Sequence, residues 1–164
     1  MKDSTASLNL LGFDVQGAEP NQDPTQPFVN KLQFEGTVSS HNNFWSGFRF
    51  QFWTPASSSD ELDLQVIVKG EVKTYLNGGE GLSVYTYSNT FPDLSFTVKD
   101  GGSWESCQNG ENDISNAGDE YSGAGATISF VDEAGTGGYT CDTSAVEHGA
   151  QGLPICVPCP AVCN

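Results

Sequence analysis

The chain has 164 residues, the usual size of one domain, so we expect a single core over residues 1–164. Hydrophobic residues make up 37% of the chain and charged residues 16%, with 19 Gly and 8 Pro, which is typical of many short strands and turns. The net charge of -15 excludes a basic nucleic-acid-binding surface and argues against docking on an anionic membrane.

The charge divides the chain into two parts. All six basic residues lie in residues 1–99, together with 11 acidic residues, whereas residues 100–164 hold 10 acidic residues and no Lys or Arg. The second part also contains all five cysteines. We therefore expect a regular β-rich part over residues 1–99, followed by acidic, Gly-rich loops, one or two strands and a tail over residues 100–164.

The N-terminal residues contain no apolar stretch of signal-peptide length, and no later segment has the length and apolarity of a membrane span. Two interpretations remain open. Either Met1 replaces a signal peptide that has been removed, or the protein leaves the cell by another route, as a virion component would. Both place the protein outside the cell or at a cell or virion surface.

Short stretches of alternating hydrophobicity predict strands along most of the first part. Residues 7–15 form a bulged strand near Gly12, and a Pro-rich connection follows over residues 17–27. Further strands are predicted over residues 28–38, 44–53, 62–69, 72–76, 82–87 and 94–98, and then over 126–131 and 137–141. Residues 101–125 are expected to form a long acidic loop, and no internal repeat is recognised. This spacing predicts an all-β fold, an antiparallel β-sandwich or jelly roll with a disulfide-rich C-terminal tail.

The segment 44–53 is the most aromatic part of the chain. Alternation along a strand places Phe44, Phe48, Phe50 and Phe52 on one face, which we assign to the core. The opposite face then carries Trp45, Arg49, Gln51 and Trp53, two flat rings beside a cation and an amide, which suits stacking on sugar rings. Tyr85 and Tyr87 share a strand face and extend this candidate carbohydrate surface; simple packing is the alternative for both sets.

The acidic loop contains part of a calcium-binding pattern. Calcium takes six to eight oxygen ligands, which alternate side chains on a tightly turning loop can supply. The spacing resembles an EF-hand loop, but Ile114 stands where that loop needs Gly and no helical pattern flanks it, so an EF-hand is rejected. A different calcium site that uses some of Glu111, Asp113, Asp119 and Glu120 is predicted, with a solvated acidic loop as the alternative.

The five cysteines, Cys107, Cys141, Cys156, Cys159 and Cys163, lie where few apolar residues are available for packing. Disulfides are therefore expected, with Cys107 to Cys141 and two of the three tail cysteines as the suggested pairs and one thiol left over. The spacing Cys156, Cys159, Cys163 also fits part of a zinc or iron–sulfur site, with His148 or another cysteine as a further ligand.

Catalytic motifs are not recognised, and we expect no enzyme. His41 lies in a turn and His148 in a Gly-rich loop, and neither adjoins a nucleophile motif. The leading hypothesis is a structural or assembly subunit of a filament, capsid or surface layer, whose partners are copies of itself. The alternative is a carbohydrate-binding module or lectin, and the third is a hydrolase using carboxylates that the sequence does not single out. Calcium is the one cofactor suggested.

Overall fold

The computed structural model describes residues 1–16, 31–52, 64–86, 94–99, 101–118, 125, 127–133, 135 and 138–160. These residues form 13 β-strands and contain no helix, so the prediction of an all-β fold is confirmed. The strands are β1 (Lys2–Ser7), β2 (Phe13–Gln16), β3 (Lys31–His41), β4 (Phe48–Phe52), β5 (Leu64–Val68), β6 (Glu71–Tyr75), β7 (Leu82–Thr86), β8 (Leu94–Val98), β9 (Ser103–Cys107), β10 (Ile114–Ala117), β11 (Ile128–Asp132), β12 (Tyr139–Thr140) and β13 (Ser144–Glu147).

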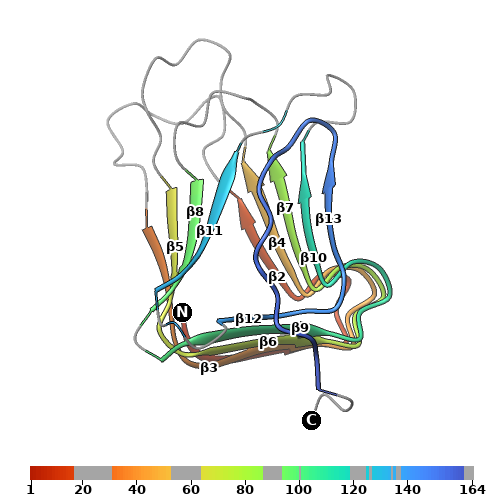
Figure 1. Ribbon diagram of the computed structural model, residues 1–164. Helices are drawn as coiled ribbons and strands as arrows, with labels where there is room; N and C mark the ends of the chain where they lie inside the picture. Colours follow the sequence, from red (N-terminus) through yellow and green to blue (C-terminus); the bar gives the residue numbers. More distant parts are fainter. Residues whose placement is uncertain are drawn as a thin grey trace, which may run out of the picture.

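All pairings between these strands are parallel, so the predicted antiparallel β-sandwich or jelly roll is wrong. Figure 1 looks along the stack and shows three walls. The first wall contains β1, the end of β3, β6, β9 and β12; the second contains β2, β4, β7, β10 and β13; the third contains the start of β3, β5, β8 and β11. The chain passes through the walls in this order and then begins again. This is a β-solenoid, and we call each passage through the walls a coil.

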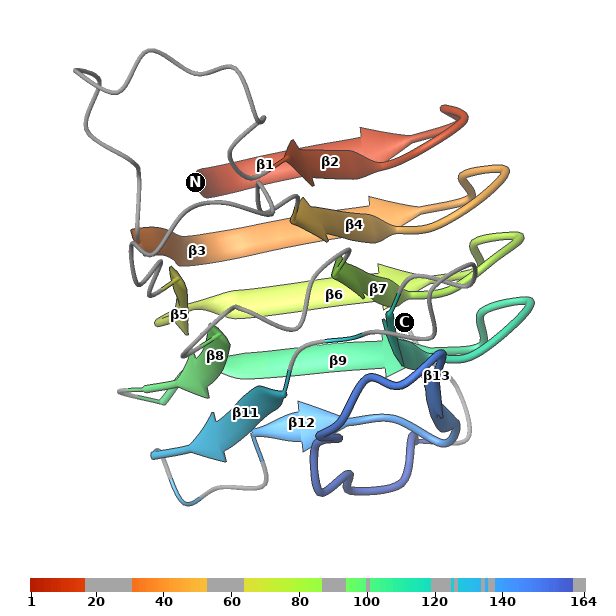
Figure 2. The ribbon, with the colours of Figure 1, turned by 90° about the horizontal axis from the view of Figure 1, so that it is seen from above.

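Figure 2 shows the coils stacked from the N-terminal to the C-terminal end. Each strand therefore pairs with the strand one coil later and not with its neighbour in sequence, as Phe48 in β4 does with Leu82 in β7. The long strand β3 turns from the third wall into the first at Gly36, whose φ is 66°, and so joins these walls into one eight-stranded sheet. The expected acidic loop over residues 101–125 instead contains β9 and β10.

The corner between the first and second walls carries an internal repeat that the sequence analysis missed. A hydroxyl residue, an Asn three positions later and a Gly four positions after that recur one coil apart, first as Ser40, Asn43 and Gly47 and then as Thr74, Asn77 and Gly81. Ser106 and Asn109 follow in the next coil, with Asp113 in place of Gly.

In this corner the asparagines form a ladder along the stack. The backbone N–H of Asn43 donates to Asn77 Oδ1 at 3.1 Å, and that of Asn77 donates to Asn109 Oδ1 at 3.3 Å. Each hydroxyl donates to a backbone oxygen across the corner, from Ser40 to Gly47 and from Thr74 to Gly81. The ladder thus satisfies backbone groups that the tight turn removes from strand pairing.

The glycines of the repeat are required by close packing between coils. A Cβ atom at Gly47 would overlap the Thr74 hydroxyl and lie 2.8 Å from the Gly81 carbonyl oxygen. The Asp113 backbone follows the same course, since the Leu82 N–H donates to its oxygen as the Phe48 N–H does to that of Gly81. A side chain fits there because the next coil crosses the corner in fewer residues, with Thr140 beside Glu105 and Ser144 already beside Ile114.

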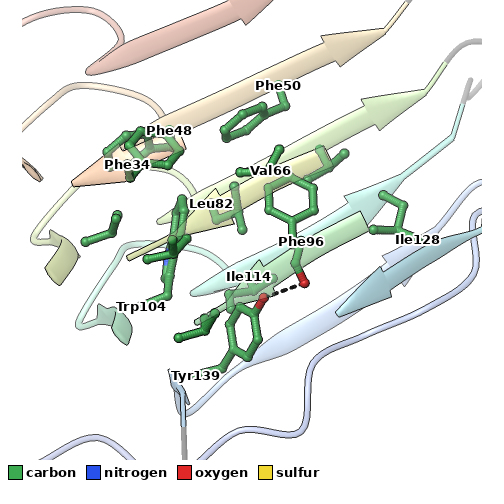
Figure 3. Close-up of a cluster of buried hydrophobic side chains, with 14 of the residues drawn as sticks. Phe34, Phe48, Phe50, Val66, Leu82, Phe96, Trp104, Ile114, Ile128 and Tyr139 are labelled. Carbon is green, nitrogen blue, oxygen red and sulfur yellow. Dashed lines mark hydrogen bonds between the residues drawn. The ribbon is translucent and has the colours of Figure 1, made fainter. Parts of the chain in front are cut away.

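The interior of the solenoid is filled by the inward side chains of the three walls (Figure 3). Trp104 of β9 is fully buried, and its ring packs edge-on against Phe34 and Phe48 at centroid distances of 5.9 and 5.2 Å. At the C-terminal end of the stack, Tyr139 donates a hydrogen bond to the Phe96 carbonyl oxygen at 2.8 Å. Burial and then Asp132 raise the pKa of Tyr139, so its hydroxyl stays protonated at neutral pH.

The C-terminal tail pairs with the last coil. The Val157 N–H donates to the Tyr139 carbonyl oxygen at 2.8 Å, and the Cys141 N–H donates to Val157 at 3.0 Å. Two disulfides fasten the tail: Cys107 to Cys159, with Cα atoms 6.0 Å apart, and Cys141 to Cys156, at 5.3 Å.

Both suggested pairings, Cys107 with Cys141 and two of the three tail cysteines with each other, are therefore wrong, because Cys107 and Cys141 each bond to a cysteine of the tail. Because the sulfurs of Cys156 and Cys159 are bonded in disulfides, they are not available as ligands for the suggested zinc or iron–sulfur site. Cys163 lies outside the described residues.

Two disulfides indicate an oxidising, extracellular-type environment. No helix in the described part of the chain is long and apolar enough to cross a membrane.

Candidate functional site

The outer face of the second wall brings together residues from neighbouring coils. In β4, Phe48 and Phe50 point into the core and are fully buried, so the intervening Arg49 and the following Gln51 face outward. The parallel register places Arg49 beside Ser83 and Gln51 beside Tyr85, both from β7. Polar and aromatic side chains from two coils therefore share one surface, which is the right-hand wall of Figure 1.

A hollow of about 230 Å³ opens on this face, and we call it the Trp45 hollow. It is lined by Leu11, Trp45, Ser46, Arg49, Gln51, Gly79, Glu80, Tyr85 and Glu111. Four of the residues predicted to bind carbohydrate therefore lie together: Trp45, Arg49, Gln51 and Tyr85. The other two, Trp53 and Tyr87, lie outside the described residues.

One assignment in this region is wrong. Phe44 was expected on the core face, but it is 69% exposed, because residues 44–47 belong to the corner and the strand begins only at Phe48. Trp45, at 47% exposed, reaches the hollow from this corner and not from a strand. Two glutamates that line the hollow, Glu80 and Glu111, come from the same corner one and two coils later. The repeat would have indicated this alignment.

Glu80 is at the centre of a hydrogen-bonded group. Its Oε2 accepts from the Ser46 hydroxyl at 2.8 Å, and its Oε1 accepts from the Tyr85 hydroxyl at 3.3 Å. The Ser83 hydroxyl donates in turn to Ser46 Oγ at 3.1 Å. Burial and then the charge of Glu80 raise the pKa of Tyr85 well above its ordinary value, so this hydroxyl remains a donor at neutral pH.

Arg49 is held by a two-point ion pair. Its Nε and Nη2 atoms donate to the two carboxylate oxygens of Asp14 in β2, at 3.1 and 2.9 Å. This geometry fixes the plane of the guanidinium group and pairs its positive charge with the carboxylate of Asp14. The lining of the hollow therefore includes an oriented guanidinium group as well as the carboxylates of Glu80 and Glu111.

A second, more open hollow of about 670 Å³ adjoins the first at Trp45. Its lining is Leu8, Asn9, Asn42, Asn43, Phe44, Trp45, Leu76 and Gly78. Leu8 is 84% exposed and Leu76 50% exposed, and both have left-handed backbone conformations, with φ of 59° and 54°. We call Leu8, Leu10, Phe44 and Leu76 the apolar corner, since each is exposed where the first wall turns into the second.

The residues predicted to bind calcium are placed differently from one another. Glu111 is exposed at the Trp45 hollow, whereas Asp113 is buried, and Asp119 and Glu120 lie outside the described residues. The Asp113 carboxylate accepts from Asn109 Nδ2 at 3.1 Å through one oxygen. Its other oxygen accepts from the backbone N–H groups of Asp142 and Thr143, at 2.9 and 3.2 Å. The carboxylate thus ends the asparagine ladder, and calcium binding stays a prediction.

One carboxylate oxygen of Asp113, one of Asp142 and the Cys159 sulfur lie within 4.8 Å of one another, close enough to surround a metal ion. The Cys159 sulfur, however, is bonded to Cys107, and Asp142 Oδ1 accepts from the Cys159 backbone N–H at 2.9 Å. Both contacts hold the tail against the last coil. The arrangement is explained by these structural contacts without an ion.

Replacing Asp113 by Asn should lower the free energy of unfolding by about 2–3 kcal/mol, with or without calcium, because an amide nitrogen would face a buried N–H donor. Urea unfolding with calcium and with a chelator measures this change, and Glu111→Gln is the control with the same change of charge at an exposed position. A calcium-dependent stability that Asp113→Asn abolishes would instead make Asp113 a ligand.

The two histidines occupy separate places. His41 stacks on Tyr75 at a centroid distance of 4.9 Å, on the first wall. His148 lies 3.7 Å from the Glu147 carboxylate, just after β13. Neither lines the Trp45 hollow.

Comparison with known proteins gives no family: no protein-family model, curated protein or solved structure matches the chain.

Proposed function

We propose that the protein binds carbohydrate, without catalysis, through the Trp45 hollow. The observation that supports this proposal is the gathering of Trp45, Arg49, Gln51 and Tyr85 at one hollow on the outer face of the second wall. A sugar ring has an apolar C–H face that can stack on the indole, and hydroxyl groups around its edge that need hydrogen-bonding partners. Gln51 and the glutamates supply these partners around the ring of Trp45.

The exposure of Trp45 agrees with such a role. A large aromatic ring that is half exposed beside polar side chains leaves apolar surface in contact with water, which a ligand can cover. The ion pair with Asp14 and the hydrogen bonds to Glu80 hold the neighbouring side chains in place before a ligand arrives. This reduces the conformational entropy that binding would otherwise cost.

Trp45→Ala should weaken binding to oligosaccharides by at least about tenfold, equivalent to about 1.4 kcal/mol. Titration calorimetry with a panel of soluble tetrasaccharides measures this change. Tyr75→Ala, which removes an aromatic ring from the outer face of the first wall, is the matched control and should bind as the wild type does. Binding that survives Trp45→Ala unchanged would overturn the proposed site.

A second proposal is a structural or assembly role at a cell or virion surface, with copies of the same chain as partners. The apolar corner supports it, because Leu8, Leu10, Phe44 and Leu76 are all at least half exposed, and such side chains commonly mark protein–protein contacts.

If the apolar corner joins copies of the chain, Leu8→Ser combined with Leu76→Asn should convert oligomers into monomers. Asn is compatible with the left-handed backbone there, as Asn42 shows one coil earlier with φ of 54°. Light scattering after size-exclusion chromatography, with calcium and with a chelator, measures the molar mass. A wild-type monomer under both conditions would contradict assembly.

A further inference from the structure

The Trp45 hollow presents hydrogen-bond acceptors and negative charge more than donors. The hydroxyl protons of Ser46 and Tyr85 are both directed at Glu80, and the hydroxyl of Ser83 is directed at Ser46. The two carboxylates, Glu80 and Glu111, retain lone pairs beyond these bonds, since each carboxylate can accept about four hydrogen bonds.

The positive charge of Arg49, which lines the hollow, is already paired with a carboxylate. Arg49 forms its two-point pair with Asp14, so its guanidinium is poorly placed to neutralise an acidic ligand. Glu80 and Glu111 both line the hollow, and their charges, together with that of Glu147, help to raise the pKa of the Tyr85 hydroxyl. An anionic sugar would meet repulsion there, both locally and from the net charge of -15.

We infer that the ligand of the Trp45 hollow is an amino sugar carrying a protonated amine, of the kind found in glucosamine oligosaccharides. This inference rests on the proposed carbohydrate-binding function and narrows its ligand class. The ammonium group donates to Glu80 and Glu111, and it lies against the aromatic rings of Trp45 and Tyr85, whose faces attract cations. The sugar ring stacks on the remaining surface of Trp45.

The test compares two probes that differ only at the nitrogen of each sugar unit: the glucosamine tetramer, which carries charged ammonium groups, and its N-acetylated counterpart, which carries uncharged acetamide groups. Titration calorimetry at mildly acidic pH, where the amines are protonated, should show at least about tenfold tighter binding of the glucosamine tetramer. The preference should persist at about 0.15 M salt, where the attraction of distant charges is largely screened.

Glu111→Gln and Glu80→Gln should each reduce this preference at least about threefold, since either removes one carboxylate charge from the hollow. The matched control is Glu35→Gln, which removes the same charge from an exposed position on β3 and should leave the preference unchanged. Glu80→Gln also alters the hydrogen bonds that Glu80 accepts from Ser46 and Tyr85. Glu111→Gln changes the charge at an exposed position and leaves these bonds intact.

Each outcome bears on the two proposals separately. Equal binding of the two tetramers, lost in Trp45→Ala, would overturn the amino-sugar inference and leave the carbohydrate site standing. A preference that Glu35→Gln reduces as much as Glu111→Gln would show attraction by net charge alone and would also overturn the inference. If no tetrasaccharide binds, both proposals fail.

Discussion

Asn77→Ala is expected to lower the free energy of unfolding by about 3–5 kcal/mol, because several buried hydrogen bonds depend on this one side chain. Asn77 is 2% exposed. Its Oδ1 accepts from the Asn43 backbone N–H at 3.1 Å and from Asn43 Nδ2 at 2.9 Å. Its Nδ2 donates to Thr74 Oγ1 and Asn109 Oδ1, both at 2.9 Å. Alanine would leave the buried Asn43 backbone N–H without its acceptor and would remove the side-chain hydrogen bonds by which Asn77 links three coils.

Urea unfolding followed by fluorescence or circular dichroism measures this effect. Gln65→Ala provides the control, since Gln65 is an exposed residue on the outer face of the third wall. We expect this substitution to lower the free energy of unfolding by less than about 0.5 kcal/mol. A loss below about 1 kcal/mol for Asn77→Ala would contradict the ladder as a main stabiliser of the corner.

Removing the Cys107–Cys159 disulfide is expected to destabilise the protein by about 4 kcal/mol, because this bond closes a loop whose ends are 52 residues apart. The Cys141–Cys156 bond has a sequence separation of 15, so its loss should cost about 3 kcal/mol. The double variants Cys107→Ala with Cys159→Ala and Cys141→Ala with Cys156→Ala allow the comparison in the same unfolding assay. In each, both partners are replaced, so no new free thiol complicates the result.

Peptide mapping without reduction checks the pairing independently. Fragments containing Cys107 should be linked to fragments containing Cys159, and those with Cys141 to those with Cys156. A Cys107–Cys141 fragment would contradict the arrangement in which the tail is fastened to the last coils. Equal destabilisation by the two double variants would contradict the loop-length argument only.

The sequence predicted individual strands better than their arrangement. The alternation of residues 48–52 and 94–98 identified β4 and β8, because an inward side chain must be apolar whichever strand lies beside it. The same alternation does not show whether the neighbouring strand is parallel or antiparallel. The spacing of Asn43, Asn77 and Asn109 indicates stacked coils and therefore parallel strands. This repeat was not recognised because the residues between the asparagines differ from coil to coil.

In the candidate site too, local alternation predicted some residues, whereas the stacking of coils added others. Period-two alternation placed Arg49 and Gln51 together on one face of a strand, and the structure places them so. Glu80 and Glu111 were not assigned to this surface, since they follow Trp45 by one and two coils and come close only when the coils stack. Asp113 was assigned by spacing to an acidic calcium loop, whereas stacking surrounds its carboxylate with N–H donors.

By itself, then, the sequence determined the all-β class, the oxidising environment implied by its cysteines, and the polar outer face of β4. These follow from local periodicity and composition, which act within a few residues along the chain. Only the tertiary structure decided the parallel stacking, the disulfide partners and the set of residues around Trp45. Each of these depends on contacts between residues well separated along the chain, where the register of the stack, and not the local pattern, sets which side chains meet.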